Sequence, residues 1–486
     1  MTGDLLSAGV KSILLIPLYA RFMTPTEYGL FGTVNTIVIV LGIISMLGLQ
    51  SAVSRFYFIY KANEEENRYL ASIWIFQIAF SIGLTIILVL NEELLWQWAA
   101  PNIPKEPYFL IVILGVLLAF SSIIYSTCLR AQERPWPFFF LQLLSTIIYI
   151  LLTAIFLIGF KWGALGAICA GLGGSLATTI LAFAMVGRKL KFKLETKYIK
   201  ESIVYGGWMM TGTLAYTALD RSQILILQHY ADLGKVGILT LGLQLSGVIM
   251  MISASINKAW QPHIFSSSTS ELASETMRTH AKHYVAGMVF SALVLSVLAR
   301  DIVLLLAGRA YAETSSVLVL LVGAAFLQSL AAIPSSALLY ERRAGLVQLF
   351  LTLSALITIL LSMLLVPVWQ MTGAAVSILV SSFLFAVMSY MMAQRILWIN
   401  YNWRDIGKVV GIGCLLFALA SAIPVSLIIP YDTILRLVII SLYPVGLITL
   451  GVFRYAEVQS ISGKIFGTLS HRVQQVRDRM CGRNTT

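Results

Sequence analysis

Charged side chains interrupt several long apolar stretches of this sequence, and they are the residues whose chemistry needs an explanation. Most are cationic, one is acidic and one is a histidine: Lys11, Arg55, Arg221, Lys258, Asp220 and His263. At the centre of a membrane-spanning helix, a charge costs at least about 2.5–3.5 kcal/mol unless it faces a partner or water. If these stretches cross a membrane, the charges predict a polar cavity that binds a charged molecule.

The composition indicates that the stretches do cross a membrane. Of the 486 residues, 58% are hydrophobic and 12% are charged, whereas soluble domains carry about 25% charged residues. The mean hydropathy is +0.85. Because a helix needs about 20 apolar residues to cross the hydrocarbon layer, we predict an all-α polytopic membrane protein of about fourteen spans, at 4–22, 28–52, 70–90, 108–130, 137–159, 162–186, 202–230, 235–262, 284–307, 313–340, 346–366, 373–394, 408–428 and 433–453.

The distribution of Lys and Arg predicts the orientation of these spans. With the N-terminus inside, 25 of the 34 Lys and Arg residues fall on the inner side and eight on the outer side, and Lys11 lies within a span. Because positively charged loops stay in the cytoplasm, both termini are predicted to be cytosolic. The net charge of +12 then reflects topology and contact with anionic lipids, and we expect no nucleic-acid partner.

Other classes of site find little support in the sequence. The N-terminus lacks the basic region and cleavage site of a secretory signal. Three of the four cysteines fall within spans and there is no CxxC pair, so we expect neither disulfides nor a metal site. The sequence also lacks P-loop, HExxH, GxSxG and paired-carboxylate motifs, and its outer loops are short. We therefore expect neither an enzyme nor an ATPase.

The sequence also contains a weak internal repeat. At an offset of 208 residues, "YGLFGTV" (28–34) lies over "VGILTLG" (236–242), and Gly166 lies over Gly373 at an offset of 207. Six spans thus repeat as another six, and an even number of spans makes the two lobes parallel. We predict a first lobe at 1–186, a basic linker at 187–201, a second lobe at 202–394, two further helices at 395–453 and a basic tail at 454–486.

The polar residues match across this repeat. Lys11 falls over Leu219, beside Asp220 and Arg221, whereas Gln50 falls over Lys258 and Arg55 over His263. Matched depths in both halves indicate one shared cavity. Simpler roles stay open, because Lys11 can snorkel to the inner surface, and Arg55 and His263 can anchor helix ends. As sequence neighbours on a helix, Asp220 and Arg221 are not expected to face one another.

Several motifs in sequence order resemble one family. The stretches are "IPLYARFMTPTEYGLFG", "LGLQSAVSRFY", "GALGAICAGLGG" and "ALDRSQILI". Together with the helix count and the basic central linker, they resemble the Wzx-type polysaccharide flippases of the multidrug/oligosaccharidyl-lipid/polysaccharide (MOP) exporter superfamily. The resemblance covers nearly the whole chain. It implies two six-helix lobes around a central cleft lined by spans one, two, seven and eight, which are the spans that carry the charges.

By that resemblance, the protein flips a polyprenyl-diphosphate-linked oligosaccharide, such as an O-antigen, capsule or exopolysaccharide unit, to the outer leaflet of the bacterial inner membrane. Cationic side chains suit the diphosphate. The candidate substrate-binding residues are Lys11, Arg21, Arg55, Asp220, Arg221, Lys258 and His263, and the candidate cleft-lining residues are Asn35, Gln50 and Gln244. No cofactor is expected beyond a coupling H⁺ or Na⁺. The implied partners are the glycan lipid, membrane lipids, and the polysaccharide polymerase and chain-length machinery.

Two alternatives stay open. A MATE-like exporter of organic cations would share the fold, but it should carry unpaired carboxylates in its cleft, where only Asp220 qualifies. A glycan polymerase or ligase should have a large outer loop, which the sequence lacks. Finally, Pro25 and Gly29 are expected to form a tight outward turn, with Tyr28 at the membrane interface, and Gly206 and Gly207 could let the seventh span bend.

Overall fold

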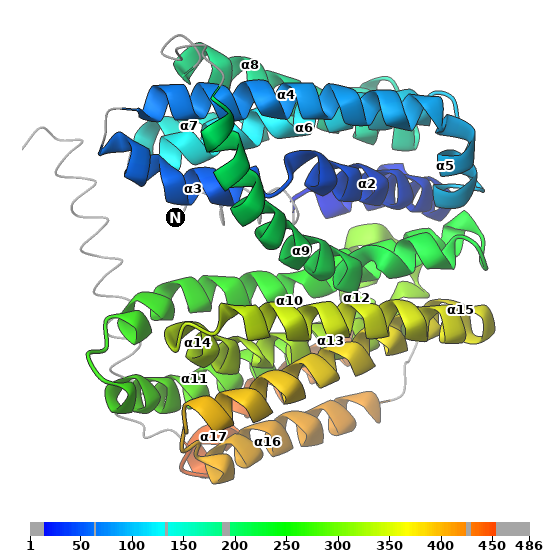
Figure 1. Cartoon of the computed structure of the whole chain (residues 1–486). Coiled ribbons are helices and arrows are strands. Elements are labelled where there is room, and N and C mark those ends of the chain that lie inside the picture. The colour runs from blue at the N-terminus through cyan, green and yellow to red at the C-terminus, as the bar shows by residue number, and fades with distance from the viewer. Residues whose placement is uncertain (1–13, 63–64, 132–134, 187–194, 424–428, 453–486) are drawn as a thin grey trace, which may run out of the picture. The chain divides into compact units, whose positions relative to one another are not determined.

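The computed structural model describes residues 14–62, 65–131, 135–186, 195–423 and 429–452. These residues form helices and, within the described ranges, no strand (Figure 1), which confirms the all-α prediction. Lys11, most of the linker 187–201 and the tail 454–486 lie outside the described residues.

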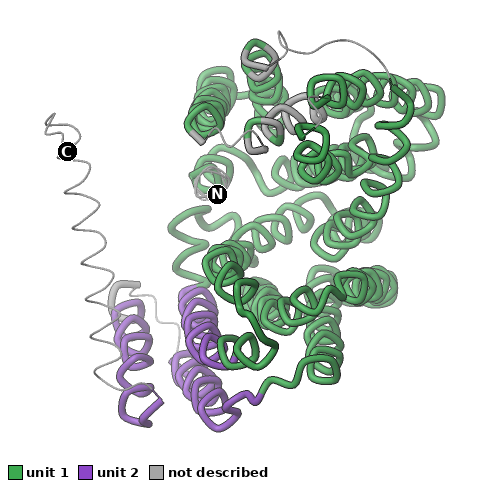
Figure 2. Tube along the Cα trace, turned by 60° about the vertical axis from the view of Figure 1, so that its left-hand side comes forward, with its two compact units in different colours: residues 1–277, 299–399 green, residues 278–298, 400–486 purple. Residues whose placement is uncertain are grey.

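The helices divide into two compact units, which Figure 2 shows in different colours. The first unit comprises residues 1–277 and 299–399, and the second comprises residues 278–298 and 400–486. The domain boundaries predicted from the sequence stay a prediction.

The N-terminal half of the first unit begins with the helical segment 14–22. Its further helices are α2 (Pro25–Met46), α3 (Leu49–Lys61), α4 (Glu66–Leu90), α5 (Glu92–Ala99), α6 (Tyr108–Ala131), α7 (Pro135–Ala154), η1 (Ile155–Gly159) and α8 (Gly163–Val186). Helix α5 is short and follows α4 almost directly. Its side chains Leu94 and Trp98 are exposed. They lie in the loop after the third span, which is predicted to face outward.

The rest of the first unit begins with the long helices α9 (Thr196–Leu227) and α10 (Leu233–Phe265). It continues with α12 (Ala299–Ala307), η3 (Arg309–Tyr311), α13 (Thr314–Leu330), α14 (Ala332–Tyr340) and α15 (Ala344–Ile396). Helix α15 contains both of the spans predicted at 346–366 and 373–394. It consists of two helices that meet at Gln370, where φ is 48° and ψ is −121°.

The second unit contains most of α11 (Ser270–Val297), together with α16 (Trp403–Ser421) and α17 (Ile429–Thr449). Gly413 packs tightly against the Val289 side chain, and the Tyr443 hydroxyl donates to the Ala286 carbonyl oxygen over 3.1 Å. These contacts tie the last two helices to α11.

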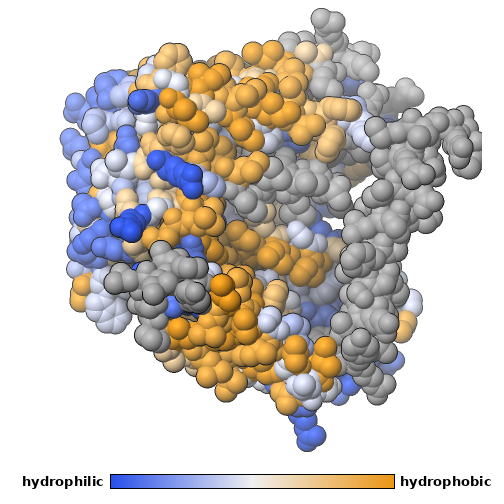
Figure 3. Space-filling model, turned by 180° about the vertical axis from the view of Figure 1, so that it is seen from behind, coloured by the Kyte–Doolittle hydropathy of each residue, from blue (hydrophilic) through white to orange (hydrophobic). Residues whose placement is uncertain are grey.

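Within the described ranges, eight helices are long and apolar enough to cross a membrane, and α11 with α12 would make a ninth as one bent span. The predicted total of about fourteen spans stays a prediction. Large exposed apolar side chains such as Leu90 and Val368 lie on these helices, with 78% and 73% exposure. In Figure 3 hydrophobic residues dominate a broad face, and hydrophilic residues gather along one edge. Such a surface suits a lipid environment, and the chain is therefore a multi-pass membrane protein.

Candidate functional site

Helices α2 and α10 cross at two glycines that correspond in the internal repeat. A Cβ atom on Gly29 would lie 2.9 Å from the Gly237 nitrogen, and a Cβ on Gly237 would lie 2.9 Å from the Gly29 nitrogen. Each would lie closer still to a carbonyl oxygen, of Leu233 and of Pro25 respectively. Small residues let membrane helices approach this closely. The reciprocal contacts follow the offset of 208, as expected for two helices that are related by a pseudo-twofold axis. We call this contact the outer crossing, because it lies at the helix ends that are predicted to face outward.

The turn before α2 differs from the prediction. Thr24 caps the helix, with its hydroxyl accepting from the Glu27 nitrogen and the Glu27 carboxylate accepting from the Thr24 nitrogen. Pro25 occupies the first turn of the helix, where its missing N–H costs nothing. The prediction that Gly29 belongs to the turn is wrong, because Gly29 lies inside α2 and provides the close approach to α10.

Tyr28 is buried at the outer crossing, and its predicted place at the membrane interface is wrong. Its side chain is 0% exposed. Its hydroxyl donates to Gln244 Oε1 over 2.7 Å, and its ring meets the Tyr311 ring edge to face at 5.8 Å. The Tyr311 hydroxyl in turn donates to the Met23 carbonyl oxygen over 3.0 Å. A buried phenol hydroxyl needs a hydrogen-bond partner, and Tyr28 finds its partner on α10. Tyr28 therefore links the two lobes.

A break at Leu47 and Gly48 redirects the chain between α2 and α3. Both residues have positive φ, 47° and 66°. A Cβ on Gly48 would lie 2.7 Å from the Gly206 carbonyl carbon and closer to its oxygen. Gly206 therefore supports close packing inside α9. Helix α9 changes direction along its length (Figure 1), and the placement of the bend at Gly206 and Gly207 stays a prediction. After the break, α3 packs on α4, α6 and α9, whereas α10 packs against α2 (Figure 1).

The inner half of α9 is fixed to the first lobe by buried tyrosines. The Tyr198 hydroxyl donates to Glu65 Oε2 over 3.0 Å, and the Tyr60 hydroxyl donates to Glu201. The Tyr60 ring also stacks on the Tyr69 ring at 4.8 Å. These contacts fix the inner end of α9 to α3 and α4, and α3 is not among the helices that pack extensively on α10.

The predicted cations at these inner ends are exposed. Arg55 on α3 places its guanidinium 4.7 Å from the centroid of the Tyr205 ring of α9, a cation–π contact. Lys258 and His263 are exposed on α10. Because they are five residues apart, they lie about 7.5 Å apart along the helix axis. The structure thus places cations on α3 and α10, the two helices that diverge below the outer crossing.

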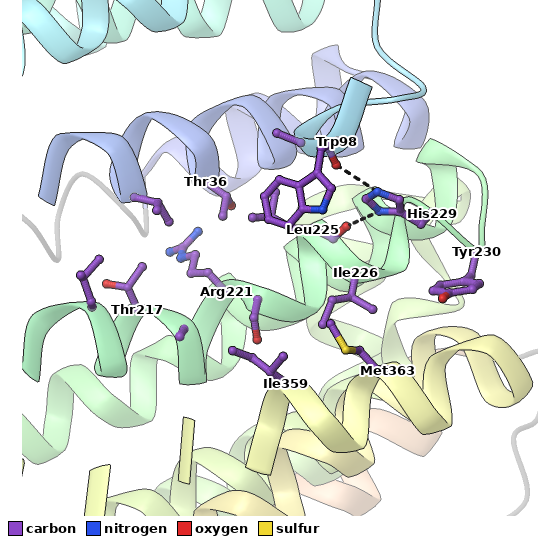
Figure 4. Close-up of a pocket in the computed structure, with 15 residues that line it drawn as sticks. Thr36, Trp98, Thr217, Arg221, Leu225, Ile226, His229, Tyr230, Ile359 and Met363 are labelled. Atoms are coloured by element: carbon purple, nitrogen blue, oxygen red, sulfur yellow. Dashed lines mark hydrogen bonds between the residues drawn. The ribbon is translucent and has the colours of Figure 1, made fainter. Parts of the chain in front are cut away.

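Arg221 lines a separate pocket of about 480 Å³ in the outer half of the first unit. The walls are mostly apolar and come from α2, α5, α9 and α15, with Thr36, Trp98, Leu225, Ile359 and Met363 among them (Figure 4). The expectation that Asp220 and Arg221 do not face one another is wrong, because the Arg221 Nε donates to Asp220 Oδ2 over 3.1 Å. The flexible Arg side chain folds back along the helix to reach its neighbour.

The predicted site residues therefore form two groups. Tyr205, which holds Arg55, is sixteen residues from Arg221, and this spacing corresponds to about 24 Å along α9. The inner group contains Arg55, Lys258 and His263, and the outer group contains Asp220 and Arg221. Of the other predicted residues, Gln244 joins the outer crossing through Tyr28.

Three further predicted residues lie elsewhere. Arg21 donates to the Leu305 carbonyl oxygen over 3.3 Å. Asn35 and Gln50 are half-buried on α2 and α3.

The sequence reasoning missed the outer contact between α5 and the end of α9. Side chains of Asn102, Gln228 and His229 bridge these segments through backbone carbonyl groups. The signal was present as the short segment "EELLWQWA" (92–99), which interrupts the loop after the third span. No sequence pattern, however, says which distant helix end such a segment meets.

Among the described residues, no three His, Cys, Asp or Glu side chains gather in a way that could hold a metal ion. The outer pocket is largely apolar, and the inner cations sit on exposed helix faces. In chemical terms, the first lobe and the second lobe meet tightly at one end and present positive charge at the other. Such an arrangement suits the binding of an anionic, amphiphilic molecule.

Comparisons with known proteins agree on the fold. A family model described as "Polysaccharide biosynthesis protein" matches residues 1–268. None of the curated proteins matches the chain.

Several solved structures are similar to the chain. The lipid II flippase MurJ in an inward closed conformation superposes with a TM-score of 0.76 at 14% identity, covering 92% of this chain and 98% of that chain. An inward-facing MATE family multidrug transporter of the MOP superfamily gives 0.64 at 13% identity, covering 82% and 95%. A MOP superfamily transporter from Pyrococcus furiosus gives 0.53 at 14% identity, covering 84% and 95%. At these identities the likeness shows the fold, which is that of the MOP transporters.

Proposed function

Because the chain belongs to the polysaccharide biosynthesis protein family of the MOP superfamily, we propose that it flips a polyprenyl-diphosphate-linked oligosaccharide across the bacterial inner membrane. The observation that carries the proposal is the placement of exposed cations on α3 and α10 below the outer crossing. The diphosphate of such a lipid carries the negative charge that these side chains would bind.

The inner group of cations suits the first step, the capture of the lipid headgroup from the cytosolic leaflet. Arg55 offers a planar guanidinium that can make two parallel hydrogen bonds to a phosphate, whereas Lys258 acts as a point charge. The Tyr205 ring beneath Arg55 restrains the guanidinium, so less side-chain freedom is lost on binding. Lys11, which lies outside the described residues, is proposed to contribute from the first span.

The contacts between the lobes support transport by alternating access. In this structure α2 meets α10 at the outer crossing, while α3 and α10 diverge at the inner ends. Separation of the glycines Gly29 and Gly237, with loss of the Tyr28–Gln244 hydrogen bond, would open the outer ends. The two parallel lobes can rock about a site between them, as is general for transporters built from repeats.

The proposed orientation follows from the positive charge of the inner loops. Both termini lie in the cytosol, and the helix ends around Pro25 and Asp232 face the periplasm. The protein has no nucleotide-binding motif in its sequence, so we propose that an ion gradient of H⁺ or Na⁺ drives the cycle. A membrane potential contributes about 2.3 kcal/mol per charge per 100 mV. The polymerase and chain-length machinery would receive the flipped glycan.

The structure disfavours the MATE-like exporter as an alternative. An exporter of organic cations needs a carboxylate available to the drug. The single acidic candidate, Asp220, is already paired with Arg221, which lowers its attraction for a cation.

Deletion and complementation test the proposal. Cells that lack the gene should accumulate the lipid-linked oligosaccharide on the cytosolic side, as mass spectrometry of the lipid extract would detect, and should lose surface glycan. The wild-type gene should restore the surface glycan. Arg55→Ala and Arg221→Ala should restore little of it, and Arg55→Lys and Arg221→Lys should restore it partly. Arg404→Ala, an exposed position on α16, is the matched control. An unchanged lipid pool after deletion would contradict the proposed function.

A further inference from the structure

A group of buried polar side chains lies where helix α2 ends and helix α4 passes beside it (Figure 1). Gln77 of α4 donates to the Ser45 carbonyl oxygen of α2, and its Nε2 also lies 3.4 Å from Ser81 Oγ. The hydroxyl groups of Ser45 and Ser81 are hydrogen-bonded over 2.8 Å. Both serines are 0% exposed and Gln77 is 1% exposed. We call these three residues the α2–α4 polar group.

The break in the second span presents the Ser45 carbonyl oxygen to α4. Helix α2 ends at Met46, and Leu47 takes the left-handed conformation that turns the chain into α3. Carbonyl groups in the last turn of a helix have no partner within that helix, and Ser45 belongs to this turn. The same carbonyl groups form the negative end of the helix dipole, which favours a cation. The break therefore gives the polar group a backbone oxygen and a negative partial charge.

Gln77 brings a further oxygen that no donor meets. Its Oε1 is buried and has no hydrogen-bond partner. Gln77 follows Glu66, at the inner end of α4, by eleven residues, so it lies about 17 Å along the helix, near the middle of a span of 25 residues. Lipid chains cannot satisfy an amide oxygen at this depth, and leaving it without a partner is unfavourable. The donor half of the amide fixes α4 to α2, whereas the acceptor half indicates a ligand that takes up lone pairs.

The group offers four uncharged oxygens: Gln77 Oε1, the hydroxyl oxygens of Ser45 and Ser81, and the Ser45 carbonyl oxygen. Each has a lone pair to share, and the soft terminal torsion of glutamine lets Oε1 turn toward the other three. The sequence carries no charged residue at 28–46 of α2 or at 69–90 of α4. Because Ca²⁺ and Mg²⁺ sites use carboxylates, neutral oxygens suit a monovalent cation. Broken transporter helices hold Na⁺ through such unwound carbonyls and helix C-terminal ends.

We infer that the α2–α4 polar group is a sodium site in the first lobe. The hydroxyl oxygens are 2.8 Å apart, and so compact a site favours Na⁺ over the larger K⁺. The bound ion joins the end of α2 to α4 and stabilises the break at Leu47 and Gly48. Because the outer half of α2 forms the outer crossing with α10, the ion holds the helix whose position closes the outer ends.

The site gives the proposed ion gradient a place to act. The inference rests on the proposed function only for that use, because ion binding can be measured without a glycan lipid. The measurement is equilibrium dialysis of radioactive sodium against the purified full-length protein in detergent, with choline keeping the ionic strength constant. Binding should saturate at a single ion per chain. Unlabelled Na⁺ should displace the tracer, and K⁺ at the same concentration should not.

Thermal unfolding gives a second readout of the same binding. The melting temperature of the wild type should be higher in Na⁺ than in K⁺, because an ion that binds only the folded state stabilises it. Melting in choline shows, for each variant, whether the protein folds without the ion.

Two variants remove ligands with little change in side-chain size. Gln77→Met keeps the length of the side chain but has no amide oxygen, so it should abolish saturable binding and the Na⁺-dependent rise in melting temperature. Ser81→Ala removes one oxygen of the four. It should weaken binding about tenfold or more, because a contact between a polar group and a charge is worth at least that factor. If Gln77→Met fails to fold, Ser81→Ala decides.

Ser336→Ala on α14 is the matched control. Ser336 is also buried, but its hydroxyl donates to the Ala332 carbonyl oxygen of its own helix over 2.8 Å. This variant should bind sodium as the wild type does.

Absence of saturable sodium binding in the wild type would overturn the inference, as would wild-type affinity in both Gln77→Met and Ser81→Ala. A purely structural role would also overturn it, and Gln77→Met would then lower the melting temperature equally in Na⁺ and K⁺. Failure of the proposed function would leave a different record. The lipid-linked glycan would not accumulate after deletion, while sodium binding still depended on Gln77 and Ser81.

Discussion

Alanine at Gly29 and Gly237 should open the outer crossing. The Cβ of either alanine would lie 2.9 Å from the nitrogen of the opposite glycine and closer still to a backbone carbonyl oxygen. Contacts under 3.0 Å to backbone do not occur for real Cβ atoms, so the two helices must move apart. Because the obstacle on each side is backbone, a rotamer change cannot relieve it.

The size of the effect follows from the cost of such overpacking, which is typically about 1–3 kcal/mol. At about 1.4 kcal/mol per tenfold, either substitution should reduce the closed population roughly 5- to 150-fold. The same change should weaken the Tyr28–Gln244 hydrogen bond. The helix itself gains from alanine, which has the higher helix propensity, so the protein should still fold.

The assay is the distance between spin labels on cysteines at Leu94 of α5 and Val368 of α15, both strongly exposed, measured by double electron–electron resonance on Gly29→Ala, Gly237→Ala and the double variant. All three should show longer distances and weaker restoration of surface glycan. Gly247→Ala is the matched control, because it lies on α10 with no atom within 4 Å of the added Cβ. Wild-type distances and wild-type glycan in the double variant would refute the reasoning that the glycines set the closure.

Two further predictions test the break in the second span and the orientation of the chain. Gly48→Ala should destabilise the protein severely, by about 1–3 kcal/mol or more, because its φ is 66° and an added Cβ would collide with the Gly206 carbonyl group; thermal unfolding in detergent measures it, and a melting temperature equal to wild type would contradict the close packing. For topology, a cysteine at Lys105 should react with an impermeant reagent added outside, while one at Lys193 in the basic linker should not. The opposite pattern would reverse the orientation.

The fold was predictable from the sequence because long apolar runs have few alternatives in a membrane. The repeat at an offset of 208 places Gly29 over Gly237 as equivalent positions, but it did not predict that the two glycines contact each other. What the repeat could not give was the distance between them. The glycine was assigned to a turn, because a Pro-Thr-Glu-Tyr-Gly sequence is also typical of a turn, whereas its neighbour Tyr28 proved to be buried against Tyr311.

The candidate site was predictable only in part. Arg55, Lys258 and His263 were identified from charge within apolar sequence, and they do lie on helices that diverge below the outer crossing. Their separation from Arg221 depends on how α9 runs between the lobes, which its sequence does not reveal. The pairing of Asp220 with Arg221 was missed because helical spacing rules describe backbone positions, whereas a long side chain can fold back to its neighbour. His229 was missed because its partners are backbone carbonyl oxygens. Every residue has such an oxygen, so the sequence does not show which of them a side chain meets.

Translocation by the purified protein tests the central claim most directly. The protein is reconstituted into phospholipid vesicles together with a polyprenyl-diphosphate-linked oligosaccharide extracted from the deletion strain, and the fraction of glycan accessible to an external glycosidase is followed with time. Wild type should move the lipid between leaflets, and the variant with alanine at Lys11, Arg55, Arg221 and Lys258 should not, although it inserts normally. Equal translocation by the two proteins would contradict the role of the cations in carrying the diphosphate.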